Sequence, residues 1–92
     1  MANIKSAIKR IRSSGRRRLR TRRARTEART YTKSAKVQIE AGELEAAQKS
    51  VAEAIRVLDR AAERGIIHRN NAARRKSRLL RQLNQAMQAK EA

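Results

Sequence analysis

Residues 39–67 read IEAGELEAAQKSVAEAIRVLDRAAERGII and contain two of the three glycines of the chain, Gly42 and Gly65. Between these glycines the apolar residues recur at intervals of three and four positions, which places them along one face of an α-helix. Because glycine readily adopts the positive φ with which many helices end, each glycine predicts a helix end and a turn after it. The stretch therefore predicts a helix over about residues 43–64, and another that ends near Gly42.

The segments on either side of this stretch have the same helical periodicity, and no window alternates with the two-residue period of a β-strand. We expect helices over about residues 4–41 and about residues 70–89, the second with Asn70 or Asn71 as its N-cap. Short connections make consecutive helices antiparallel neighbours. The sequence thus predicts an all-α protein, a three-helix bundle in which residues 1–92 form a single domain.

The positive charge of the chain is concentrated at its two ends. The formal net charge is +17, to which residues 1–36 contribute +13, residues 37–64 contribute −2 and residues 65–92 contribute +6. At 1.5 Å per residue the first helix would be about 57 Å long and the second about 33 Å, so the N-terminal half of the first helix has no partner helix. Like charges four residues apart destabilise that half. We expect it to be frayed or disordered in the free protein and helical against a polyanion.

The composition limits both the core and the chemistry. Ala supplies 17 residues, Ile, Leu and Val together supply 16, and Phe, Trp, Pro and Cys are absent. The lack of Cys and the single histidine, His68, argue against a metal site and against nucleophilic or acid–base catalysis. Three widely spaced glycines cannot form a phosphate-binding loop, and no apolar run is long enough to cross a membrane. We therefore expect a cytoplasmic protein that is not an enzyme and that uses no cofactor, metal, membrane or small-molecule substrate.

A chain this basic is expected to bind a polyanion. Arg outnumbers Lys by 18 to 7, and its planar guanidinium group binds phosphate oxygens in pairs. A helix that is charged on all sides suits phosphates that arrive from several directions, as in folded RNA, better than a single DNA groove. From charge alone, the candidate RNA-contacting residues are Lys5, Lys9, Arg10, Arg12, Arg16, Arg17, Arg18, Arg20, Arg22, Arg23, Arg25 and Arg29 in the first helix and Arg74, Arg75 and Arg78 in the third.

Other interpretations compete with RNA binding. A histone-like DNA-compacting protein would bind duplex DNA as well as RNA, and the composition disfavours it only weakly. A membrane-surface helix is disfavoured because the apolar stripe is narrow and Trp and Phe are absent. A merely solvated charged surface is disfavoured by the self-repulsion of +13 within 36 residues. Tyr31, the one aromatic residue, is expected to be a core residue with its hydroxyl at the edge rather than to stack on a base.

Two blocks of the sequence resemble a known family. Residues 1–7 read MANIKSA and residues 65–79 read GIIHRNNAARRKSRL. These blocks, with the residues between them in register, are similar to bacterial small-subunit ribosomal protein S20. The resemblance implies a three-helix bundle with an elongated first helix, direct binding to small-subunit ribosomal RNA and a role in early subunit assembly. It leaves contacts with other small-subunit components open, and it implies a ribosomal location in the bacterial cytosol, with the plastid stroma as the alternative.

The resemblance, carried over position by position, implies further RNA-contacting residues. In the first block these are Asn3 and Ser6, besides Lys5, Lys9 and Arg10. In the second block they are His68, Asn70, Lys76 and Ser77, besides Arg74 and Arg78, and Arg69 of the same block is a further candidate. The family commonly has Lys where this chain has Ile8, and Asn where it has Thr21, so no contact is carried over to those two positions.

Overall fold

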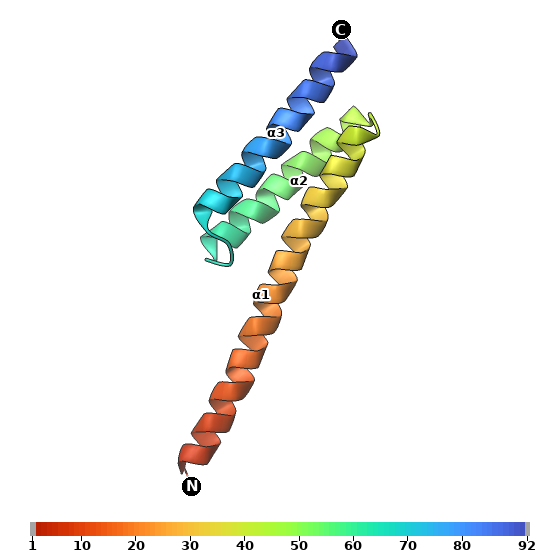
Figure 1. Ribbon diagram of the computed structural model, residues 1–92. Coiled ribbons are helices and arrows are strands. Elements are labelled where there is room, and N and C mark those ends of the chain that lie inside the picture. Colours follow the sequence, from red (N-terminus) through yellow and green to blue (C-terminus); the bar gives the residue numbers. More distant parts are fainter. Residues whose placement is uncertain (1, 92) are drawn as a thin grey trace.

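The chain folds into three helices, which Figure 1 shows in a computed structural model that describes residues 2–91, with side chains described from Ile4 to Glu91. The helices are α1 (Ala2–Glu40), α2 (Leu44–Glu63) and α3 (Arg69–Glu91), and the described residues form no strand. The all-α prediction is confirmed. Each observed helix end lies within two residues of the expected one.

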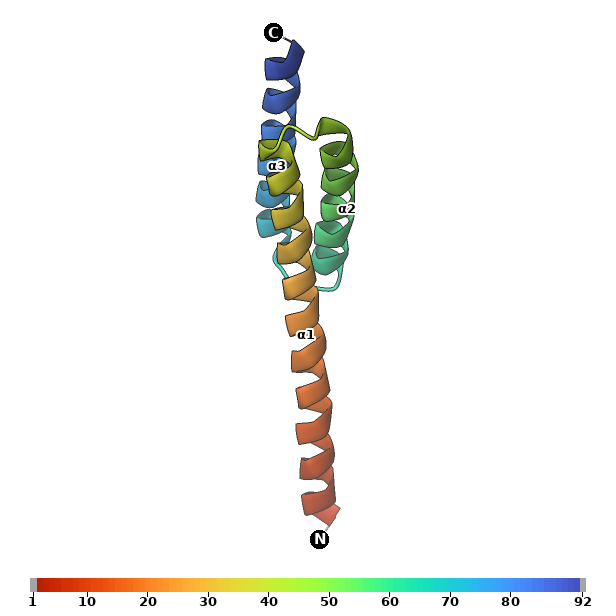
Figure 2. The same ribbon diagram turned by 90° about the vertical axis from the view of Figure 1, so that its right-hand side faces the viewer.

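The bundle occupies only one end of a long molecule. The helix α2 runs back along the C-terminal half of α1, and α3 reverses again to run beside α2, so that α1 and α3 point the same way (Figures 1 and 2). The molecule measures 73 × 22 × 13 Å, and its radius of gyration of 18.4 Å exceeds the value of about 12 Å expected for a compact domain of this length. Residues 4–20 of α1 are all exposed, which confirms the predicted absence of a partner helix there.

The turn between α1 and α2 depends on Gly42. Its φ is +77°, in the left-handed region that other residues rarely adopt. The Gly42 N–H donates to the Ile39 carbonyl over 3.1 Å, and the Glu43 N–H donates to the Gln38 carbonyl, also over 3.1 Å. These are the two bonds of a Schellman motif, which satisfies carbonyls that the end of α1 leaves unpaired.

The second turn repeats this motif at Gly65, whose φ is +72°. The Gly65 N–H donates to the Ala62 carbonyl over 3.0 Å, and the Ile66 N–H donates to the Ala61 carbonyl over 2.9 Å. Ile66 is partly buried, as expected for the residue that follows the glycine and folds back on the last turn of the helix. Both glycine predictions are therefore confirmed.

The prediction for the N-cap of α3 was wrong by two or three residues. His68, rather than Asn70 or Asn71, is the N-cap: its carbonyl accepts the first helical bond, from the Ala72 N–H at 3.1 Å. Its Nδ1 accepts a hydrogen bond from the Asn70 N–H, also at 3.1 Å. The imidazole therefore takes the place of the usual side-chain oxygen, because it satisfies one of the free N–H groups of the first turn.

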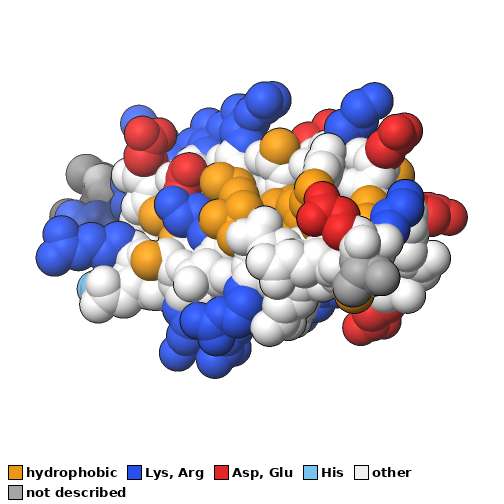
Figure 3. Space-filling view, turned by 90° about the horizontal axis from the view of Figure 1, so that it is seen from above, with side chains coloured by type: hydrophobic (Ala, Val, Ile, Leu, Met, Phe, Trp, Pro, Cys, Tyr) orange, Lys and Arg blue, Asp and Glu red, His pale blue; other side chains and the backbone are white. Residues whose placement is uncertain are grey.

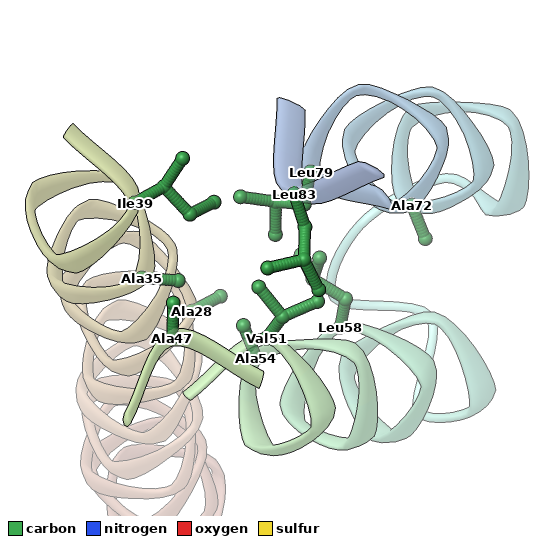
Figure 4. Packing of buried hydrophobic residues seen from close by; sticks show 10 residues of the cluster. All are labelled: Ala28, Ala35, Ile39, Ala47, Val51, Ala54, Leu58, Ala72, Leu79 and Leu83. Atoms are coloured by element: carbon green, nitrogen blue, oxygen red, sulfur yellow. The ribbon is translucent and has the colours of Figure 1, made fainter. Parts of the chain in front are cut away.

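The core lies where the three helices meet, and α2 contributes the largest share of it. Figure 4 shows the buried side chains pointing from all three helices into one interior. They are Ala28, Ala35 and Ile39 from α1, Ala47, Val51, Ala54 and Leu58 from α2, and Ala72, Leu79 and Leu83 from α3. The largest of those that are fully buried are Leu58, Leu79 and Val51. The many alanines allow the helix backbones to approach closely, so a small set of large residues fills the centre.

Tyr31 lies at the edge of the core and is more exposed than a core residue with only its hydroxyl at the edge would be. Its side chain is 36% exposed, whereas Ala28 and Ala35 on the same stripe of α1 are almost fully buried. Since the close contact of α1 with the rest of the bundle runs through these alanines, a ring as large as that of Tyr31 fits only at the edge. The apolar stripe continues into the unpartnered half of α1, where Ile4, Ile8, Ile11 and Leu19 are also exposed.

Candidate nucleic-acid interface

The projecting part of α1, residues 4–20, forms a continuous basic surface that we call the overhang. It contains no Asp or Glu. The cationic residues of the overhang are Lys5, Lys9, Arg10, Arg12, Arg16, Arg17, Arg18 and Arg20. Because a helix places successive residues about 100° apart, these side chains project on every side of it. All of them are exposed, their contact with RNA stays a prediction, and Asn3 is the one candidate here whose side chain lies outside the described residues.

The overhang carries its own shallow grooves between rows of Arg and Lys. One groove is lined by Lys9, Arg10, Arg16, Arg17 and Arg20 together with the hydroxyl-bearing residues Ser6 and Ser13. A second groove continues toward the bundle and is lined by Arg17, Arg18, Thr21, Arg22, Arg25, Thr26 and Arg29. Thr21, at which no contact was carried over, thus lies in the second groove. Guanidinium groups combined with hydroxyls offer phosphate oxygens both charge and hydrogen-bond donors.

The conformation of the overhang is helical from Ala2 onward. This is the conformation that the sequence predicts for the state bound to a polyanion. The fraying or disorder expected in the free protein stays a prediction. No buried apolar residue of α1 precedes Ala28, so tertiary packing adds nothing to the stability of residues 4–20.

A second basic feature, which we call the α1–α3 cleft, lies between the C-terminal half of α1 and the start of α3. One part of it, with a volume of about 320 Å³, is lined by Arg29, Thr32, Lys33, Lys36, Arg75 and Arg78. The adjoining part, with a volume of about 280 Å³, is lined by Arg25, Arg29, Ile66, Ile67, His68, Asn71 and Arg75. The two parts share Arg29 and Arg75 and are therefore continuous. The sequence predictions missed Lys33 and Lys36, although both lie within one helical face of Arg29.

The remaining candidates of the second sequence block occupy different places. Arg69, Asn70, Arg74 and Ser77 are exposed, and His68 is exposed while it caps α3. Lys76, another candidate, donates from its Nζ to Asp59 Oδ1 of α2 over 2.6 Å. Because both side chains are partly exposed, this ion pair contributes only about 0–1 kcal/mol to stability.

Most of the acidic side chains lie apart from these basic surfaces, and the exception is Glu27, between Arg25 and Arg29 on α1. Five of the six acidic residues between positions 37 and 64 belong to α2 or to the turn before it, and all are exposed. Figure 3, which looks down on the bundle end, shows Lys and Arg projecting in several directions and Asp and Glu over only part of the perimeter. In the described part of the chain, Lys76 with Asp59 is the only ion pair, so the cations of the overhang and of the α1–α3 cleft are not neutralised within the molecule.

Among the described residues, no helix combines the length and the apolar character that a bilayer crossing requires. In the overhang, Lys and Arg lie on both sides of the apolar stripe. The surfaces with a clear chemical character are therefore the two basic ones.

Comparison with known proteins identifies the family. The sequence pattern of the family described as Ribosomal protein S20 matches residues 2–84. The chain is 53% identical over 90 residues to the small ribosomal subunit protein bS20 of Thermomicrobium roseum, a match that covers 98% of the chain and 91% of that relative. The chain belongs to the ribosomal protein S20 family. The resemblance noted in the two sequence blocks is thereby confirmed, and it extends along nearly the whole chain.

Other S20 family members agree with this assignment. The chain is 52% identical over 89 residues to the small ribosomal subunit protein bS20 of Roseiflexus sp., and the match covers 97% of each protein. It is 48% identical over 88 residues to the protein of the same name from Coprothermobacter proteolyticus, covering 96% of the chain and 100% of that relative. As a member of a ribosomal protein family, the chain has a structural role in the ribosome and is not an enzyme.

Proposed function

We propose that this S20 family member binds small-subunit ribosomal RNA directly, through contacts of Arg and Lys with phosphates, and stabilises the packing of RNA helices during assembly of the small subunit. The proposal is supported by the names of the relatives, which are small ribosomal subunit proteins. It places the chain, as a single domain, on the ribosome in the bacterial cytosol. Contacts with other small-subunit components are compatible with it.

The observation that carries the proposal is the overhang. Its cations project on all sides of a helix that no other part of the protein covers, and no carboxylate lies among them. Phosphates from several RNA helices can therefore approach the same rod at once, and each contact releases counterions that the RNA had condensed. By lowering the repulsion between those RNA helices, the overhang would allow them to lie closer together.

The test is competition binding across a salt series. Labelled small-subunit ribosomal RNA is bound to the full chain and challenged with duplex DNA and with an unrelated structured RNA. We expect ribosomal RNA to retain the protein at salt concentrations that release the two competitors, because shape adds to the charge term. If all three nucleic acids dissociate together along one steep slope, charge acts alone and DNA compaction becomes the better interpretation.

A variant of the overhang tests whether this surface binds the ribosomal RNA. Replacing Arg16, Arg17 and Arg18 by Ala should weaken ribosomal RNA binding and reduce the slope of log affinity against log salt by up to about 0.7–0.9 for each phosphate that the variant no longer neutralises. The matched control replaces three exposed cations outside the proposed surfaces, Arg56, Arg81 and Lys90, and removes the same charge. Equal loss of affinity in both variants would show that only net charge matters and would contradict a role for the overhang.

A further inference from the structure

The α1–α3 cleft contains a concentration of positive charge that the fold itself does not need. Its six cations come from two helices: Arg25, Arg29, Lys33 and Lys36 from α1, and Arg75 and Arg78 from α3. Neither part of the cleft is lined by Asp or Glu, and the one ion pair in the described chain lies between α2 and α3, at Lys76 and Asp59. Like charges are thus held facing each other across a gap, which opposes the docking of α3 on α1.

The interface between α3 and α1 is also the smallest of the three helix interfaces. The helix α2 packs extensively against both of its neighbours, whereas α1 and α3 meet over a short stretch. The buried core residues of α3, including Leu79 and Leu83, join a cluster to which α2 contributes the most members. The facing cations are therefore placed at the interface where an added attraction would have the largest effect.

The cleft has the chemistry of a site for a sugar–phosphate chain. Guanidinium groups from both walls can bind phosphate oxygens in pairs. Ile66 and Ile67 line one end and are partly buried, so they offer an apolar surface to the carbon framework of a ribose. The same end adjoins the N-terminus of α3, whose free N–H groups and positive dipole add to the attraction for an anion. A small inorganic anion would use the charges but not the apolar end.

We propose that the α1–α3 cleft binds a segment of RNA backbone whose phosphates bridge Arg29 of α1 and Arg75 of α3 and thereby lock α3 onto α1. The inference rests on the proposed RNA-binding function and adds a second binding surface, which shares Arg25 and Arg29 with the groove that continues from the overhang. The bundle then binds RNA itself, in addition to holding the overhang. Without a ligand, the facing cations weaken the α1–α3 interface, and with RNA bound they strengthen it, so binding is linked to the stability of the fold.

The test compares thermal unfolding of the full chain with and without a short RNA at low salt, followed by circular dichroism. The probe is the hexaribonucleotide of uridine, which has no folded shape of its own and is long enough to enter the cleft. The cleft variant carries Arg29→Gln and Arg75→Gln. The control variant carries Arg56→Gln and Arg81→Gln, which remove the same charge from exposed positions outside the cleft.

We compare the Tm of the cleft variant with that of the control variant, first without RNA and then with RNA. Without RNA its Tm should be at least as high as that of the control variant, because the facing charges are gone. With saturating hexaribonucleotide, the Tm of the wild type and of the control should rise by several degrees, and that of the cleft variant by less than half as much. A full rise in the cleft variant would overturn the proposal.

A further arm uses tripolyphosphate, which supplies phosphate charge without ribose. We expect it to raise the Tm of the wild type less than the hexaribonucleotide does at equal total charge, and an equal rise would overturn the assignment to a sugar–phosphate chain. The competition assay with ribosomal RNA separates this inference from the proposed function. If ribosomal RNA still binds selectively while the hexaribonucleotide stabilises neither the wild type nor the control, the cleft proposal fails and RNA binding through the overhang stands.

Discussion

Leu58 shows how a few large residues hold this alanine-rich core together. It lies on α2, its side chain is fully buried, and it belongs to the cluster formed by all three helices. Replacing it with Ala should lower the free energy of unfolding by about 2–5 kcal/mol, because the transfer free energy of the side chain is lost and a cavity remains. Urea unfolding measures this. The matched control is Leu80→Ala on α3, where the side chain is 42% exposed, and equal destabilisation by the two substitutions would contradict the assignment of the core.

His68 offers a second prediction at the level of one residue. Its Nδ1 accepts the Asn70 N–H at the start of α3, so His68→Ala should destabilise the bundle by about 0.5–2 kcal/mol. His68→Asn is the informative control, because it also removes the imidazole but supplies an oxygen that can accept the same hydrogen bond. Thermal unfolding of the two variants compares them directly. Equal stability of the Ala and Asn variants would show that the capping bond contributes nothing.

The sequence misplaced one residue and missed two others, because each of the three depends on how α1 packs against its neighbours. Tyr31 follows the periodicity of α1 that places Ala28 and Ala35 in the core, yet its size places it at the edge of an interface made by alanines. Lys33 and Lys36 owe their interest to α3, which crosses their face of α1, and no pattern within one helix reports that crossing. Their spacing of four and seven residues from Arg29 was the one signal present in the sequence. The cations of the overhang were predictable, because their exposure follows from a helix without a neighbour.

At the scale of elements, α1 is one helix of which one half packs against the bundle and the other half does not. Residues 28–39 contribute buried side chains to the core, whereas residues 4–20 contribute none. In native-state hydrogen exchange without RNA, we expect the amides of residues 10–20 to exchange far faster than those of residues 28–39. The reason is that a helix with clustered like charges and no tertiary packing is only marginally stable in water. Binding of ribosomal RNA should then protect the same amides.

A control variant sharpens the exchange experiment. Gly15 lies in the middle of the overhang, and a Cβ added there would meet no atom within 4 Å. Gly15→Ala should therefore raise the helix stability of the overhang, since Gly is less favourable than Ala by about 1 kcal/mol inside a helix. Exchange of residues 10–20 should slow while that of residues 28–39 stays unchanged. Strong protection of residues 10–20 in the free wild type would contradict the prediction.

The boundaries of the elements were predictable where glycine sets them and not where a side chain does. Gly42 and Gly65 both adopt the positive φ that the sequence led us to expect, because no other residue type takes that conformation so easily. The start of α3 was predicted from the preference of Asn for the N-cap, yet the chain enters the helix earlier and uses His68. A capping preference spans several neighbouring residues, and only the path of the turn selects among them.

At the scale of the whole molecule, the net positive charge destabilises the folded bundle and favours binding to RNA. The protein carries a formal net charge of +17 and one ion pair among its described residues. Self-repulsion of this kind destabilises a compact state. Salt screens it, with a screening length of about 8 Å at physiological ionic strength. The same salt weakens binding to a polyanion, because it reduces the gain from counterion release. Ionic strength should thus change the stability of the free bundle and its affinity for RNA in opposite directions.

This opposition gives a prediction that two titrations with sodium chloride can check. The Tm of the free protein should rise between low salt and about 0.15 M, the range in which the screening length falls most, while the affinity for ribosomal RNA should fall over the same range. The variant Arg29→Gln with Arg75→Gln should show a smaller rise in Tm, because part of the repulsion inside the bundle has been removed. Replacement of Arg16, Arg17 and Arg18 by Ala should leave the rise almost unchanged, because the overhang lies beyond the packed part of α1. A Tm that stays constant or falls with added salt would show that charge repulsion does not destabilise the bundle. The proposed link between RNA binding and the stability of the fold would then have no physical basis.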